Sequence, residues 1–132
     1  LERIERLFLE GLGGIVPADY CSNILKYRKR IEEARKQAQK QLNKKEEIRK
    51  IQVNLTREFK RILTDLISES NHLLGGELQD FAVIVFGSMA REESCPYSDL
   101  EFAFLTRSLG LQNLNRLRSL SQLLTLKVIN MG

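Results

Sequence analysis

The stretch that decides the fold runs from Phe81 to Thr106 and reads FAVIVFGSMAREESCPYSDLEFAFLT. It predicts a buried apolar strand, then a Gly87-Ser88 turn that opens a short helix. A loop marked by Pro96 follows, and after it comes a second strand that carries two acids among apolar neighbours. No other part of the sequence resembles a reaction centre.

The two acids, Asp99 and Glu101, are candidate metal ligands. Successive side chains on a strand point to opposite faces, so the two carboxylates share one face and Leu100 takes the other. Adjacent carboxylates repel each other, and a divalent cation removes that cost. Because carboxylate oxygens are hard ligands, the pair predicts magnesium or manganese. The alternative is a surface strand with solvated acids, but the apolar run 102–105 favours a buried strand.

The turn before these acids predicts a seat for phosphate. Gly87 permits a ligand to approach the backbone closely, and Ser88 is the expected N-cap of the helix that follows. Backbone amides at such a turn, with the helix dipole behind them, attract phosphate. Arg91 lies one turn further on, where it either reaches a triphosphate or pairs with Glu93 or Glu101. A phosphate seat beside a metal-binding acid pair indicates nucleotide chemistry.

At these residues the chain resembles the nucleotidyltransferase superfamily, whose fold is shared with DNA polymerase beta. The signature of that superfamily is a Gly-Ser or Gly-Gly turn at the start of a helix, followed by an acid-x-acid strand. Gly87-Ser88 and Asp99-Leu100-Glu101 match its two parts. The fuller motif is most similar to the bacterial branch that includes the amino-terminal domain of protein-PII uridylyltransferase. The residues that carry it are Gly87, Ser88, Ala90, Arg91, Glu93, Pro96, Ser98 and Asp99.

The resemblance implies an enzyme that moves a nucleoside monophosphate from a nucleoside triphosphate such as ATP to a hydroxyl acceptor. In that interpretation the catalytic residues, which also hold Mg²⁺ or Mn²⁺, are Asp99 and Glu101. The nucleotide-binding residues are Gly87, Ser88, Arg91 and Ser98. The acceptor stays open: a protein side chain, a small molecule or an RNA end each supplies a hydroxyl.

The sequence departs from the family pattern in two places. The second acid of the branch is commonly Asp, whereas this chain has Glu101, and no Asp or Glu follows it to serve as the third carboxylate that the family needs. We therefore expect a piece of a larger protein, inactive by itself. Two alternatives are a degenerate copy acting as a regulatory nucleotide-binding module, and a helical protein-interaction module that uses the strands as a scaffold.

Apolar periodicity before residue 75 predicts helices. A short amphipathic helix covers 1–12, and two heptad seams follow, separated by a turn near 43–46. The seams predict a long antiparallel hairpin resembling a coiled coil, and one continuous rod is the alternative. The short helix has Ile4, Leu7, Phe8 and Leu12 on one side; the seams are Ile24, Tyr27, Ile31, Ala34 and Ala38, then Ile48, Ile51, Leu55, Phe59, Ile62 and Leu66.

The predicted fold class is α+β, with a helical region at 1–75 and a partial nucleotidyltransferase-like α/β domain at 76–132. Gly75 and Gly76 close the helical region. After the strand pair, a leucine-rich helix from 109 to about 125 covers the sheet, and a further strand starts at 127–131. We also expect the sheet to rest on an apolar stripe formed by Ile62, Leu63, Leu66 and Ile67.

Charge and cysteine usage bear on partners and location. Between Lys26 and Arg61 there are fourteen Lys or Arg against five Glu. This excess fits a surface for nucleic acid or an acidic protein, or a solvated exterior with ion pairs such as Glu32 with Lys36 and Glu46 with Lys50. No apolar run is long enough to span a membrane. The two cysteines, Cys21 and Cys95, fit no metal spacing, which predicts reduced thiols in the cytoplasm; a disulfide between them is the alternative.

Overall fold

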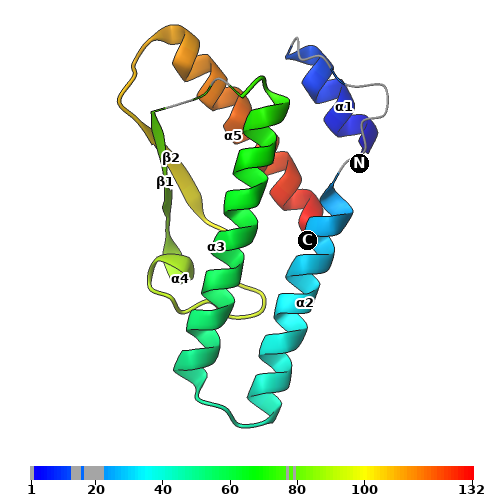
Figure 1. Ribbon diagram of the computed structural model, residues 1–132, viewed down its shortest axis with the longest axis vertical. Coiled ribbons are helices and arrows are strands. Elements are labelled where there is room, and N and C mark those ends of the chain that lie inside the picture. Colours follow the sequence, from blue (N-terminus) through cyan, green and yellow to red (C-terminus); the bar gives the residue numbers. More distant parts are fainter. Residues whose placement is uncertain (1, 13–15, 17–22, 77, 79) are drawn as a thin grey trace.

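The protein is described by a computed structural model that covers residues 2–12, 16, 23–76, 78 and 80–132. The α+β class is confirmed, because a two-stranded sheet lies against a set of helices (Figure 1). In chain order the elements are α1 (Glu2–Gly11), α2 (Ile24–Asn43), α3 (Ile48–Leu73), β1 (Phe81–Val85), α4 (Gly87–Ala90), β2 (Phe102–Thr106) and α5 (Leu111–Met131).

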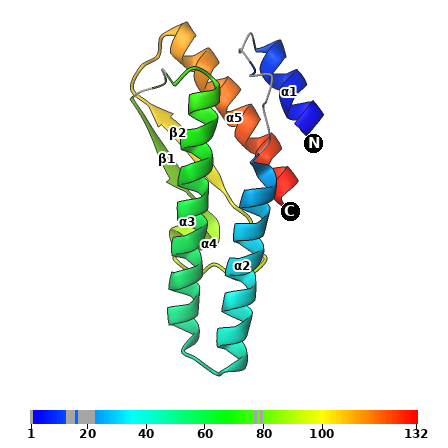
Figure 2. The same cartoon turned by 45° about the vertical axis from the view of Figure 1, so that its right-hand side comes forward.

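The helical hairpin is confirmed and the continuous rod is wrong. The chain reverses between α2 and α3 at Lys45, which has a φ of 57°, and the two helices then lie side by side (Figures 1 and 2). Both seams lie between them as predicted, with two departures: Ala34 is only partly buried, and Ile48 is 63% exposed because it is the first residue of α3 at the tip of the hairpin. The buried seam residues are Ile24, Tyr27, Ile31, Ala38, Ile51, Leu55, Phe59, Ile62 and Leu66.

The two strands are antiparallel, with Phe81 opposite Thr106 and Val85 opposite Phe102. Alternation places every second residue of each strand on the face toward α3. The predicted packing of the sheet on α3 is confirmed, because that face joins the core cluster that contains the stripe Ile62, Leu63, Leu66 and Ile67; the strand residues are Phe81, Val83, Val85, Phe102 and Phe104.

The last helix is longer than the sequence predicted. The expected end near Thr125 and the expected strand at 127–131 are wrong, since α5 continues to Met131. Its buried residues recur every three or four positions beyond Thr125, so packing of this stripe against α2 and α3 keeps the chain helical despite the β-branched pair Val128-Ile129. The buried residues of α5 are Leu120, Leu123, Leu124, Lys127 and Met131.

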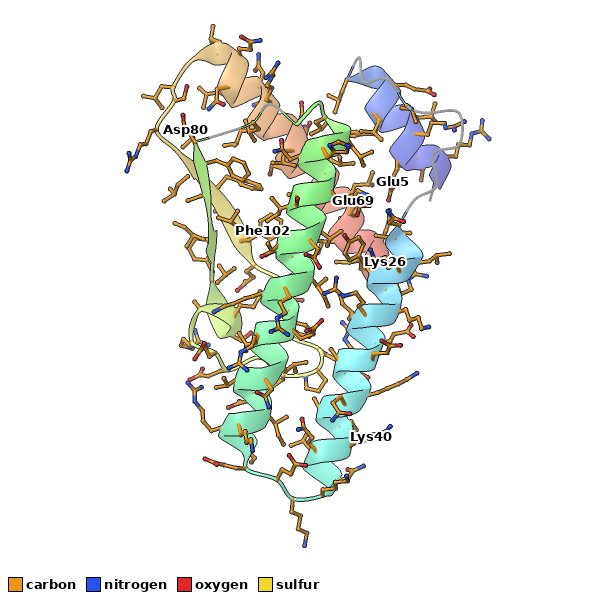
Figure 3. All side chains as sticks on the ribbon, viewed as in Figure 1. Glu5, Lys26, Lys40, Glu69, Asp80 and Phe102 are labelled. Atoms are coloured by element: carbon orange, nitrogen blue, oxygen red, sulfur yellow. The ribbon has the colours of Figure 1, made fainter. Side chains whose placement is uncertain are left out.

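The first helix packs with a different face from the predicted one. Among the residues predicted to pack, Ile4, Leu7 and Leu12 are exposed, and Glu5 and Leu9 are buried instead. The Nζ of Lys127 on α5 lies 3.6 Å from the Glu5 carboxylate, and both side chains are almost completely buried. Figure 3 labels Glu5 on the side of α1 that faces the rest of the fold. Because a buried charge is costly without an opposite charge beside it, the pairing of Glu5 with Lys127 explains the choice of face.

The predicted boundary near residue 75 coincides with the end of α3. Gly75 and Gly76 both have positive φ, and the amide of Gly76 donates a hydrogen bond to the carbonyl of Asn71 at 2.8 Å. The regions 1–75 and 76–132 stay a proposal, and their side chains share one core. Pro17, the restart of the chain after it and Cys21 lie outside the described residues. Among the residues that are described, no helix has the length and apolarity needed to cross a bilayer.

Candidate nucleotide and metal site

The predicted Gly-Ser turn begins α4, directly after β1. Gly87 has a φ of 55°, a conformation that L side chains rarely adopt. A Cβ at this position would collide with a carboxylate oxygen of Glu101 and would lie 3.3 Å from its Cδ. Glycine is therefore required both by the backbone and by the Glu101 side chain, which occupies the space predicted for a ligand.

The acid pair lies just before β2 and not on it. The strand begins at Phe102, so the prediction that Asp99 and Glu101 belong to a strand is wrong, although the Glu101 carbonyl accepts one more ladder bond from the amide of Phe86 at 2.9 Å. The physical reason is that β1 gives way to α4 at Gly87, which leaves Asp99 without a partner strand. Both acids are nevertheless exposed on either side of half-buried Leu100.

The two acids line separate cavities that adjoin each other. Asp99 lines a cavity of about 380 Å³ and Glu101 one of about 450 Å³, and the two cavities share Leu100, Val128 and Ile129. Within the described part of the chain, neither carboxylate forms an ion pair or a side-chain hydrogen bond, and no three metal-ligating side chains gather at one point. The site thus offers two accessible carboxylates in adjoining cavities.

The remaining residues of the turn are arranged differently from the prediction. Ser88 is the second residue of α4, the N-cap is Phe86, and no side chain caps the helix, so the N-cap assignment of Ser88 is wrong. A serine one position inside the helix cannot bond the amides ahead of it in the way that an N-cap does. Arg91 forms an ion pair with Glu93, one of its three predicted partners. The Nε of Arg91 lies 2.7 Å from the Glu93 carboxylate, and both side chains are exposed.

Ser98 closes a tight turn immediately before Asp99. Its Oγ accepts a hydrogen bond from the amide of Cys95 at 2.8 Å, and its own amide donates to the carbonyl of Cys95 at 3.0 Å. The Cys95 thiol is free and exposed, and Cys21 is outside the described residues. The two hydrogen bonds fix the backbone of the residue that precedes Asp99.

Sequence reasoning missed the contacts that fasten this loop, residues 91–98, to the hairpin. Arg49 of α3 donates to the carbonyls of Arg91 and Glu92 at 3.3 and 2.9 Å. Two turns further along α3, the buried hydroxyl of Thr56 accepts a hydrogen bond from the amide of Ser94 at 3.2 Å. No pattern in the sequence predicts them, because an Arg on a helix exterior has the same local signature whether it is solvated or bound.

Arg35 of α2 contacts both this loop and the end of α5. Its Nε donates to the carbonyl of Pro96 at 2.6 Å, and its Nη2 donates to the carbonyl of Gly132 at 3.0 Å. The guanidinium also lies over the ring of Tyr97, 5.1 Å from the ring centroid. One side chain thus joins α2, the loop and the end of α5.

Several basic residues of the hairpin therefore have internal partners. The predicted ion pairs Glu32–Lys36 and Glu46–Lys50 are not formed among the described residues, and Lys29 with Glu33, 4.0 Å apart, is the exposed pair at that spacing. Arg30 bridges the hairpin to two acids of α3, Glu58 at 3.2 Å and Asp65 at 2.5 Å. The use of the remaining lysines as a surface for a polyanion stays a prediction.

Comparison with known proteins agrees with the motif. Residues 29–132 match the model of a family described as "Putative nucleotidyltransferase DUF294", a range that begins in α2 and includes everything from α3 to α5. Neither the curated proteins nor the solved structures gave a match. Because the matched range is most of the chain, the resemblance to the nucleotidyltransferase superfamily is confirmed, and the chain belongs to the nucleotidyltransferase family DUF294.

Proposed function

We propose that this chain carries the nucleotide- and metal-binding part of an enzyme that transfers a nucleoside monophosphate from a nucleoside triphosphate to a hydroxyl. The observation that carries the proposal is the contact of the Glu101 carboxylate with Gly87, which brings an accessible acid to the first residue of α4. The family membership supports the same chemistry. The acceptor and the base of the nucleotide are not specified by these contacts.

The residues present fit a hard divalent cation. Asp99 and Glu101 offer carboxylate oxygens that are exposed and unpaired with other described side chains, as ligands for Mg²⁺ or Mn²⁺ should be. Two carboxylates are fewer oxygen ligands than these cations take, so Asp99 and Glu101 supply part of the ligand set. When bound, the metal neutralises phosphate charge and lowers the pKa of the attacking hydroxyl.

The turn supplies the phosphate contacts in this proposal. The first amides of a helix have no intrahelical acceptor, so those of Gly87 and Ser88 are available to the β- and γ-phosphates. Arg91 leaves its exposed partner Glu93 and binds a phosphate oxygen. The Ser98 hydroxyl oxygen accepts a hydrogen bond from the amide of Cys95, so its O–H can still donate to a nucleotide oxygen. The oxygen of the acceptor hydroxyl bonds to the α-phosphorus and loses its proton to solvent. The bond between the α-phosphorus and the oxygen that bridges it to the β-phosphorus breaks, and pyrophosphate leaves.

Calorimetry on the intact protein tests the ligand assignment. Wild type should bind Mn²⁺ in the presence of nucleoside triphosphate, and the double variant Asp99→Asn with Glu101→Gln should lose that binding because its amides cannot replace two anionic ligands. Asp80→Asn is the matched control, since this exposed acid lies before the other end of β1 (Figure 3). Equal manganese binding by wild type and the double variant would reject the site.

A regulatory module that binds nucleotide without turning it over is the second candidate, and the Glu101 carboxylate favours it, because this side chain fills the space beside Gly87. The two candidates differ in product formation. Pyrophosphate release by the intact protein, lost in the double variant, supports the transferase. Saturable nucleotide binding with no pyrophosphate release across a panel of hydroxyl acceptors supports the module. We expect residues 1–132 alone to bind without turnover, because they supply two of the three carboxylates that the family uses.

A further inference from the structure

We infer that Arg35 of α2 is a positioning residue for Asp99, so that the helical hairpin is a working part of the transferase site. This inference rests on the proposed function, in which Asp99 is a metal ligand. It assigns a role to one of the hairpin's basic residues that is distinct from binding a polyanion. The loop 91–98 and the two helices that hold it link Arg35 to Asp99.

Asp99 has no partner that could orient its own side chain. Among the described residues its carboxylate makes no hydrogen bond or ion pair, and its backbone lies outside the ladder of β1 and β2. Its location is therefore set by the chain on either side. On the carboxyl side, Glu101 is held by the amide of Phe86; on the amino side, the turn from Cys95 to Ser98 is the support.

That turn is rigid within itself and is attached to the hairpin at its tip. Two hydrogen bonds between Cys95 and Ser98 close it, as described above. The residues at the tip, Pro96 and Tyr97, are those that Arg35 contacts, one through the carbonyl and the other through the ring. A displacement of Arg35 would thus be transmitted through a closed turn to the adjoining Asp99.

The chemistry of the contact requires arginine. A planar guanidinium can donate in its plane to the carbonyls of Pro96 and Gly132 while its face covers the ring of Tyr97. Lysine carries a single ammonium group without a flat face, so it cannot make these contacts together. The adjacent anchors, Arg49 and Thr56, hold the earlier part of the loop and leave its last residues to Arg35.

The experiment compares Arg35→Lys and Arg35→Ala with Lys36→Ala in the intact protein. Lys36 is the next residue of α2, is exposed, and has no ion-pair partner among the described residues, so it is a matched control for loss of charge. We measure the dissociation constant for Mn²⁺ with nucleoside triphosphate, and the amide hydrogen exchange of residues 94–99 without metal. Both Arg35 variants should bind Mn²⁺ about 10-fold more weakly or worse, and exchange should accelerate at 94–99.

The outcomes separate the inference from the proposed function. Absence of metal-nucleotide binding in wild type rejects the proposed function. Binding by wild type that is unchanged in Arg35→Lys, with unchanged exchange at 94–99, rejects the role of Arg35. If Arg35→Ala does not fold, Tyr97→Ala replaces it, because this side chain is 83% exposed and contributes its ring to the same contact. General loss of structure would accelerate exchange in α2 and α3 as well, and that result also counts against a positioning role.

Discussion

The carboxylate of Glu101 lies against Gly87, with its Cδ 3.3 Å from the position that a β-carbon of residue 87 would occupy. This contact joins the two halves of the family signature, which are separated by a short helix and a loop in the sequence. It also gives Gly87 a structural requirement besides access for a ligand. Substitutions at residue 87 therefore test the backbone and the acid together.

Gly87→Ala should weaken metal binding and destabilise the fold. The new Cβ displaces Glu101, and a non-glycine residue at this positive φ costs about 1 to 2 kcal/mol. Calorimetric titration with Mn²⁺ and urea unfolding measure the two effects. Gly110→Ala is the control, because its φ is −61° and the nearest neighbour of an added Cβ is 4.0 Å away. A Gly87→Ala protein that binds Mn²⁺ as wild type does would contradict the importance of this contact.

Leu66→Ala should cost about 2 to 5 kcal/mol of unfolding free energy, as expected for a large apolar residue removed from a core. Leu66 is fully buried in the cluster that α3 shares with the sheet, so amide exchange in β1 should accelerate as well. Urea unfolding and hydrogen exchange measure these changes, and exposed Ile48→Ala is the control. Unchanged exchange in β1 would show that the sheet does not depend on this side chain.

Lys127→Met should loosen α1. The substitution removes the ammonium group that lies 3.6 Å from the buried carboxylate of Glu5, which costs about 3 to 5 kcal/mol unless the helix moves into solvent. Exchange of residues 2–11 should therefore accelerate, whereas Arg118→Met, at an exposed position of the same helix, should leave it unchanged. Adding Glu5→Leu to Lys127→Met should restore protection, because an apolar pair needs no charge compensation. A double variant as unprotected as the single one would argue against the ion pair as the cause.

Stability should fall in alkaline solution through Tyr27. Burial, together with the hydrogen bond that its hydroxyl donates to Glu69, raises the pKa of Tyr27. Above pH about 10 the unfolded chain loses this proton while the folded chain keeps it, so the free energy of unfolding decreases with further rise in pH. Tyr27→Phe should flatten this part of the profile, and exposed Tyr97→Phe should not. The free energy of unfolding is measured from about one pH unit below to about one pH unit above the ordinary tyrosine pKa of about 10. Profiles of wild type and Tyr27→Phe that run parallel over this window would contradict the shift.

Local pattern alone determined much of this protein. The spacing of apolar residues from Ile24 to Leu66 predicted both long helices, because a helix that buries one stripe must repeat it every three or four residues. The apolar runs flanking the loop likewise predicted the strand pair, and Gly87-Ser88 with Asp99-Leu100-Glu101 predicted the nucleotidyltransferase superfamily. These features can be predicted from the sequence because each depends on residues that are close in the chain.

Tertiary structure decided the features that depend on residues far apart. Val128 and Ile129 favour a strand locally, yet the core holds them in α5, and the buried partner Lys127 selects the face of α1 that carries Glu5. The contact of Arg35 with Pro96 spans 61 residues. The residues around Arg35 in the sequence are typical of a solvated helix exterior. The carbonyl of Pro96 comes within reach of Arg35 only when the loop folds back on the hairpin. Packing, and not local pattern, determines which charged residues of such an exterior are bound and which remain in solvent.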